Sequence, residues 1–147
     1  PILHGEGKHV NVVRLAAASG MTKAVVIFLP GAAGGVAPCR MGGQSFDAGA
    51  LFPKLAQDLS ADVPIDSYRV SWMSRSPDVQ EMVHAVCRVA LYALTIAGNA
   101  APVRLVLLGH SFGGAVAFSA AQQLRVMLAG TRAHIAGVVG HSPQAIS

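Results

Sequence analysis

Short apolar runs alternate along this chain with longer stretches in which apolar residues recur at helical spacing. Runs that are too short and too β-branched for a helix predict strands, whereas the longer periodic stretches predict helices. The predicted strands cover residues 10–16, 23–29, 68–73, 103–108 and 134–140. The predicted helices cover residues 46–59, 79–96 and 114–129. This alternation predicts an α/β fold with a mostly parallel sheet, right-handed crossovers and helices on both faces.

Turn residues set some of the expected boundaries between these elements. The Ser19-Gly20 turn allows the first two strands to form a hairpin. Pro53 lies inside the first helix, which therefore starts late or is kinked. Residues 60–66 are expected to form a loop before the next strand.

Capping residues set the expected ends of the other two helices. Ser76 is the expected N-cap of the second helix, with Pro77 at its first position and Asp78 in its first turn. Gly130 is the expected C-cap of the third helix, because glycine readily adopts the left-handed conformation that ends a helix.

Composition agrees with one folded domain over residues 1–147. Hydrophobic residues make up 52% of the chain and charged residues only 12%, and the mean hydropathy is +0.49. Such a composition fits parallel strands that are covered on both faces, or a part of a larger body. No internal repeat indicates a second unit. The chain opens with Pro1, so its N-terminus is expected to be processed or incomplete.

Charge and cysteine content exclude several classes of function. The net charge is +4, but the basic residues are scattered, so nucleic-acid binding is not indicated. Cys39 and Cys87 lack the spacing of a metal site. A disulfide between these two cysteines is possible, but nothing in the sequence requires it, so a reducing compartment such as the cytoplasm is favoured. No signal peptide is evident. No membrane span is expected, because the most apolar run, residues 85–97, is interrupted by Arg88 and falls short of about 18 residues.

The sequence Gly109-His110-Ser111-Phe112-Gly113 follows a strand directly and precedes an alanine-rich helix. A serine on so tight a turn is strained, with its hydroxyl lifted clear of the strand at the N-terminus of the helix. Side chains at the two flanking glycines would collide with the neighbouring strand and helix. The pattern predicts a nucleophile elbow with Ser111 as the nucleophile. A plain turn with close helix packing is the alternative.

A glycine-rich loop over residues 30–38 follows the second strand. It lacks both the Gly-x-Gly-x-x-Gly spacing of a dinucleotide fingerprint and the Gly-Lys-Ser/Thr ending of a P-loop. We expect it to donate backbone N–H groups near the serine, with a simple connection as the alternative. No cofactor and no metal are expected.

Residues 22–141 resemble the α/β-hydrolase fold family. The matching pieces are the strand with its loop Pro30-Gly31-Ala32-Ala33-Gly34-Gly35, the strand at 68–73, the helix start at 76–78, and Leu107-Leu108-Gly109-His110-Ser111-Phe112-Gly113-Gly114. The resemblance implies that Ser111 is the nucleophile and that the N–H groups of Ala32 and Phe112 form the oxyanion hole. It also implies that the substrate is a small-molecule carboxylic ester or thioester, cleaved through an acyl-enzyme.

One part of the family's pattern is missing from this sequence. The family's catalytic order is serine, acid, histidine, but all seven acidic residues precede Ser111. Of the histidines, His134 is expected to be structural, His110 to pack or gate beside the serine, and His141 is a candidate base at the end of a strand.

Two interpretations of this C-terminally short pattern remain open. The chain is either the N-terminal portion of a hydrolase whose acid and base lie beyond Ser147, or a shortened relative that binds ligands without catalysis. In a short chain, the strand at 134–140 would be an unpaired apolar edge through which copies of the chain could associate.

Overall fold

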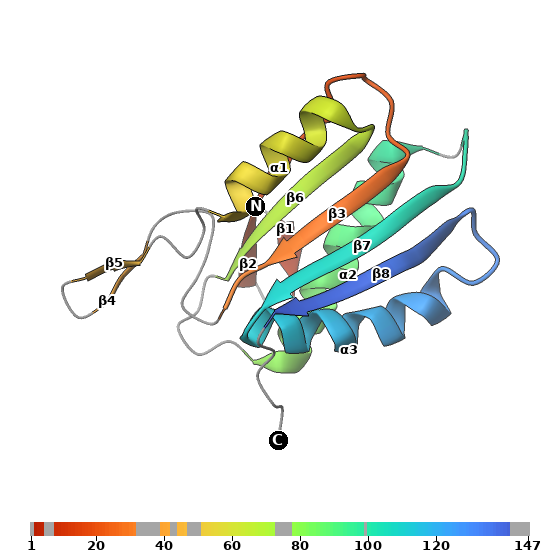
Figure 1. The fold of residues 1–147 in the computed structure, drawn as a ribbon. Helices are drawn as coiled ribbons and strands as arrows, with labels where there is room; N and C mark the ends of the chain where they lie inside the picture. Colours follow the sequence, from red (N-terminus) through yellow and green to blue (C-terminus); the bar gives the residue numbers. More distant parts are fainter. Residues whose placement is uncertain are drawn as a thin grey trace.

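The computed structural model describes residues 2–4, 8–31, 39–41, 44–46, 51–72, 78–98 and 100–141. A six-stranded sheet in the order β1-β2-β6-β3-β7-β8 forms its centre (Figure 1). These strands are β1 (Ile2–His4), β2 (Lys8–Leu15), β3 (Ala24–Leu29), β6 (Ile65–Trp72), β7 (Val103–His110) and β8 (Ala133–His141). The short strands β4 (Cys39–Met41) and β5 (Gln44–Phe46) pair only with each other.

Four neighbouring strands of the sheet, including the one that ends next to the candidate site, are parallel. Strands β6, β3, β7 and β8 run in the same direction, and β2 is antiparallel to both of its neighbours. The expected hairpin of the first two strands is wrong, because β6 lies between β2 and β3. Turn chemistry at Ser19 and Gly20 could not reveal this insertion, since β6 comes from about 45 residues further along the chain.

Helices cover both faces of the sheet, as the alternation of elements predicted. The helix α1 (Leu51–Asp62) packs its Phe52 and Ala56 on Val26 and Phe28 of β3. The helices α2 (Val79–Ala97) and α3 (Phe112–Met127) lie together on the other face, over the larger apolar core (Figure 1). The strand β8 is at the edge of the sheet, as expected.

Helix boundaries differ from the expected ones in ways that local chemistry explains. The helix α1 starts late, at Leu51, so that Pro53 falls in its first turn where no intrahelical N–H bond is lost. The N-cap of α2 is Asp78 and not Ser76, because the Asp78 carboxylate accepts the backbone N–H of Glu81 at 3.0 Å. Ser76 and Pro77 lie outside the described residues.

Three further boundaries were misplaced by a few residues. The helix α1 continues to Asp62 and β6 begins at Ile65, so the expected loop over residues 60–66 is reduced to a short turn. The helix α3 begins at Phe112, directly after the serine. It is capped at Leu128, while Gly130 adopts φ 77° two residues later and is not the cap itself.

A buried ion pair joins the antiparallel strand β2 to β6. The Asp66 side chain is 1% exposed and accepts from Arg14 Nη2 at 2.7 Å, Arg14 Nε at 3.2 Å and the Ala17 backbone N–H at 2.9 Å. Burial by itself would raise the pKa of this carboxyl, but the hydrogen bonds from Ala17 and Arg14 outweigh it and leave the pKa lowered. The pair therefore links β2 to β6, the strand that separates it from β3.

Replacing this carboxylate should weaken the fold, most clearly at neutral pH. The folded-state pKa of Asp66 is lowered, so its stabilisation is present above the unfolded value of about 3.9 and is lost as pH falls through the folded value. We expect Asp66→Asn to lower the free energy of unfolding by about 2 kcal/mol at pH 7, with a smaller loss at pH 3. Urea denaturation at both pH values measures this. Asp58→Asn, which removes an exposed pair with Lys54, should change it by less than about 0.5 kcal/mol, and equal losses would contradict the argument.

The helix α2 is long and apolar enough to cross a membrane by length and composition alone. Its apolar side is used in the core against the sheet and α3. Cys87 on this side is a buried free thiol, and burial raises its pKa to about 11. This cysteine is therefore protonated at neutral pH and is not a nucleophile.

Candidate active site

Ser111 occupies the turn between β7 and α3, at the carboxyl end of the parallel strands. Its backbone has φ 53° and ψ −120°, and it is the one non-glycine residue with positive φ in the part of the chain that the structure describes. Such a conformation costs on the order of 1–3 kcal/mol and is concentrated at functional sites. The side chain makes no capping hydrogen bond with the helix that follows. The hydroxyl therefore does not stabilise the helix by capping it.

The two flanking glycines are required by close approach of backbone segments. A Cβ on Gly109 would overlap the backbone of Gly113 and Gly114, and a Cβ on Gly113 would overlap the carbonyl oxygens of Leu29 and Pro30. These overlaps are with backbone atoms, which cannot rotate away as a side chain can. The chain therefore turns so sharply at Ser111 that β7, α3 and the end of β3 touch without any intervening side chain.

The start of the glycine-rich loop lies against the serine. A Cβ built on Gly31 would be 3.6 Å from Ser111 Cβ and 3.7 Å from His110 Cδ2. Phe112 is buried and is the first residue of α3, where backbone N–H groups have no partner within the helix. Ala32 lies outside the described residues, so its part in an oxyanion hole stays a prediction. The described geometry brings the loop and the helix N-terminus to the same serine.

Trp72, at the end of β6, links these two parts of the site. Its indole Nε1–H donates to the Pro30 carbonyl at 3.1 Å, and its ring meets Phe112 edge-on, with centroids 6.0 Å apart at 89°. Sequence reasoning missed this residue. The signal was a single tryptophan at the carboxyl end of a strand that is parallel to the nucleophile's strand and separated from it by β3, at the edge where α/β active sites form.

Loss of the indole N–H should loosen the loop without unfolding the protein. Trp72→Phe removes the donor and leaves a buried Pro30 carbonyl without this partner. We expect the free energy of unfolding to fall by about 1–2 kcal/mol and modification of Ser111 by a phosphonylating probe to slow by about tenfold, since the loop loses its anchor. Urea denaturation and probe kinetics measure these two effects.

A matched control is available on the surface of α2. Tyr92 is half exposed, so Tyr92→Phe removes the polar tip of an aromatic ring where water replaces it. We expect less than about 0.5 kcal/mol of destabilisation and an unchanged probe rate. A probe rate that Trp72→Phe leaves unchanged would mean that the loop is held without the indole.

The structure places His141 beside His110 and leaves its proposed role as a base untested. The Nδ1 atoms of the two rings are 3.0 Å apart, and the rings stack at 24° with centroids 5.2 Å apart. The His141 carbonyl accepts the Ser111 backbone N–H at 2.9 Å. His134 lies at the opposite end of β8, opposite Arg104 of β7, and is not part of this site.

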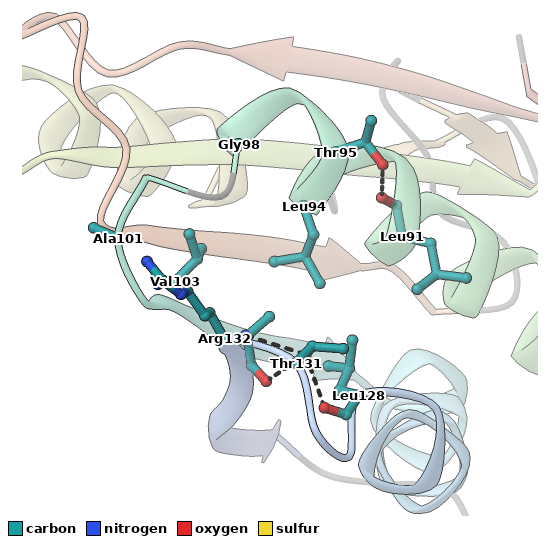
Figure 2. Close-up of a pocket in the computed structure, with 10 residues that line it drawn as sticks. Leu91, Leu94, Thr95, Gly98, Ala101, Val103, Leu128, Thr131 and Arg132 are labelled. Carbon is teal, nitrogen blue, oxygen red and sulfur yellow. Dashed lines mark hydrogen bonds between the residues drawn. The ribbon is translucent and has the colours of Figure 1, made fainter.

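Other described features do not extend the site. Within the described ranges, no group of three or more histidine, cysteine or acidic side chains could hold a metal ion. A cavity of about 200 Å³ lies between the end of α2, the start of β7 and the connection from α3 to β8, and Figure 2 shows residues that line it. Val103 and Ala133, which begin β7 and β8, line it, so it opens at the end of the sheet opposite Ser111.

Comparison with known proteins agrees with this geometry. A family model described as a thioesterase domain matches residues 43–146. A comparison with curated proteins found no match.

Several solved structures share the fold. A monoglyceride lipase from Saccharomyces cerevisiae aligns with 98% of this chain and 44% of its own, at 15% identity and a TM-score of 0.68. The siderophore hydrolase EstB from Aspergillus fumigatus aligns with 95% of this chain and 41% of its own, at 13% identity and a TM-score of 0.63. A monoacylglycerol lipase from Paleococcus ferrophilus aligns with 92% and 43%, at 18% identity and 0.54. The chain thus spans less than half the length of these structures, and at such identities the likeness is one of fold.

Proposed function

Because the chain belongs to the thioesterase domain family and has the α/β-hydrolase fold, we propose that it is a serine hydrolase of small-molecule carboxylic esters or thioesters. The observation that carries this proposal is the strained elbow that presents Ser111 at the N-terminus of α3. The strain is retained although a glycine would remove it, which is expected only where a hydroxyl is needed.

The proposed reaction proceeds through an acyl-enzyme. The Ser111 Oγ forms a bond to the substrate carbonyl carbon, and a general base takes the hydroxyl proton. The carbonyl oxygen becomes an oxyanion that accepts hydrogen bonds from the backbone N–H groups of Phe112 and, by prediction, Ala32. The bond to the thiol or alcohol then breaks, with the proton delivered to the leaving group. Water completes the cycle by the same steps and releases the carboxylic acid.

Two candidates remain for the general base, whereas the nucleophile is assigned to one residue. His141 is the candidate within the chain, and a histidine with its acid in further sequence is the alternative. A base is required, because a serine hydroxyl at its ordinary acidity is a weak nucleophile.

A fluorophosphonate probe tests the nucleophile directly. We expect the full-length protein to gain one phosphonyl group, and peptide mapping should place it on Ser111. Ser119, half-buried on α3, should remain unmodified, and heat-denatured protein should not react. Absence of labelling in a folded full-length protein would overturn the proposal. Matched p-nitrophenyl esters and acyl thioesters would then compare the two substrate classes.

A binding module without catalysis is the second candidate. It is favoured by the engagement of the His141 ring with His110. This candidate expects a folded full-length protein that neither turns over esters nor reacts with the probe.

We also propose that copies of the chain associate through β8. This strand ends the sheet in the described part of the chain, and Val139 on it is half exposed. Exposed apolar edge strands readily pair with other chains.

A further inference from the structure

We propose that His110 and His141 form an imidazole pair that positions Ser111, and that protonation of both rings releases it. This inference rests on the proposed role of Ser111 as the nucleophile. In this inference both histidines are positioning residues, because they act on the serine through the backbone, so it replaces the role of His141 as the candidate general base.

The pair joins the ends of two neighbouring parallel strands. His110 is the last residue of β7 and precedes Ser111, while His141 is the last residue of β8 and lies opposite His110 in the strand register. The short distance between their Nδ1 atoms, 3.0 Å, makes the two side chains one hydrogen-bonded unit. His141 is exposed and His110 half-buried, so protons from solvent can reach the pair.

The end of β8 also holds the strained backbone directly. The His141 carbonyl accepts the Ser111 N–H at 2.9 Å, and the Ser111 carbonyl accepts the Gly114 N–H at 2.9 Å. A Cβ on Gly140 would be 2.7 Å from Phe118 Cε2, so β8 packs closely on α3 just before His141. The Ser111 carbonyl also accepts the Ala115 N–H at 3.3 Å, so a shift of the end of β8 would remove one of three backbone hydrogen bonds that fix Ser111.

The chemistry of imidazole makes the side-chain contact sensitive to protons. A hydrogen bond between two Nδ1 atoms needs one N–H and one lone pair. A pair with at most one positive ring can provide both. Two protonated rings present two N–H donors and two positive charges at 3.0 Å, which lose the bond and repel each other. Histidine side chains generally change charge between pH 5 and 8, so a comparison across this range tests whether the contact depends on protonation.

Charged and titratable groups lie on the described elements packed around the pair. These groups are Lys23 before β3, Arg104 on β7, Arg125 on α3, His134 on β8, Asp78 at the N-cap of α2, Glu81, His84 and Arg88 on α2, and Lys54, Asp58 and Asp62 on α1. Arg104 and His134 face each other at the other end of β7 and β8, about 20 Å away at the usual rise of a strand. Arg125 is in the last turn of α3, at the opposite end from Ser111.

Amide hydrogen exchange of Ser111 in the full-length protein tests this positioning. After correction for the intrinsic exchange rate, we expect Ser111 protection to fall by about tenfold between pH 7.5 and 5.5. In His141→Asn the amide oxygen accepts from His110 in either protonation state, so protection should change by less than twofold. His134→Asn is the matched control, with the same change on the same strand, and should keep the fall seen in the unaltered protein.

The outcomes separate this inference from the proposed function. Protection that is independent of pH in the unaltered protein, or an equal fall in His141→Asn, would overturn the positioning role even if the probe labels Ser111. A second outcome is that Ser111 protection falls toward acid in every variant except His141→Asn, while the probe does not label Ser111. That result would support the contact between His110 and His141 and would reject Ser111 as the nucleophile. If His141→Asn does not fold, imidazole ¹⁵N spectra of the unaltered protein at pH 7.5 decide. One of the two Nδ1 atoms should carry a hydrogen and the other should not. Spectra in which both rings have the same protonation at Nδ1 would overturn the proposed hydrogen bond between them.

Discussion

If the proposed function holds, Ser111→Ala should reduce ester or thioester hydrolysis by the full-length protein by about 10³- to 10⁶-fold, the range that loss of a nucleophilic serine causes in serine hydrolases. The oxyanion donors and the substrate contacts remain in this variant, so a residual rate above that in water is expected. Steady-state kinetics and probe labelling measure the loss. A variant that keeps a tenth of the activity would show that Ser111 is not the attacking group.

Two further variants separate chemistry from folding at this position. Ser111→Gly removes the hydroxyl and also adopts φ 53° without strain, so it should be more stable than the unaltered protein by about 1 kcal/mol while remaining inactive. Ser119→Ala, a half-buried serine two turns into the same helix, should keep full activity. A stabilised but inactive Ser111→Gly would identify the elbow as a site where stability is given up for function.

The parts of the fold that sequence predicted best depend on local chemistry. The spacing of apolar residues placed the strands and helices, and their alternation predicted helices on both faces of a mostly parallel sheet. The elbow was also predictable, because the requirements for Gly109, Ser111 and Gly113 arise within five residues of sequence. The structure adds the backbone contacts that explain the two glycines.

The missed features depend on residues far apart in the sequence. The insertion of β6 between β2 and β3 brings Arg14 to Asp66 across 52 residues. The indole N–H of Trp72 donates a hydrogen bond to the carbonyl of Pro30, which is 42 residues away in the sequence. His110 and His141 meet across 31 residues, because strand register places them side by side. No local pattern specifies such partners, although the edge of the sheet at which they gather could be predicted.

Gly113→Ala should destabilise the protein by about 3 kcal/mol or more, although alanine is the better helix former by about 1 kcal/mol. The two effects have opposite signs, so the measurement decides which dominates. A Cβ at this position would overlap the Leu29 and Pro30 carbonyl oxygens, so the end of β3 and the loop after it must move away from Ser111. We therefore expect probe labelling of Ser111 to be lost in the same variant, even where enough protein remains folded to be tested.

Gly137→Ala supplies the matched control for this substitution. Gly137 lies in β8, and a Cβ built on it meets nothing within 4 Å. Alanine should therefore change the free energy of unfolding by less than about 1 kcal/mol and leave labelling intact. Urea denaturation and probe labelling of both variants compare a glycine needed for close approach with one that is not. If Gly113→Ala proved as stable as Gly137→Ala and still reacted, the sharp turn would not depend on contact between α3 and the end of β3, and the explanation of how the serine is presented would be wrong.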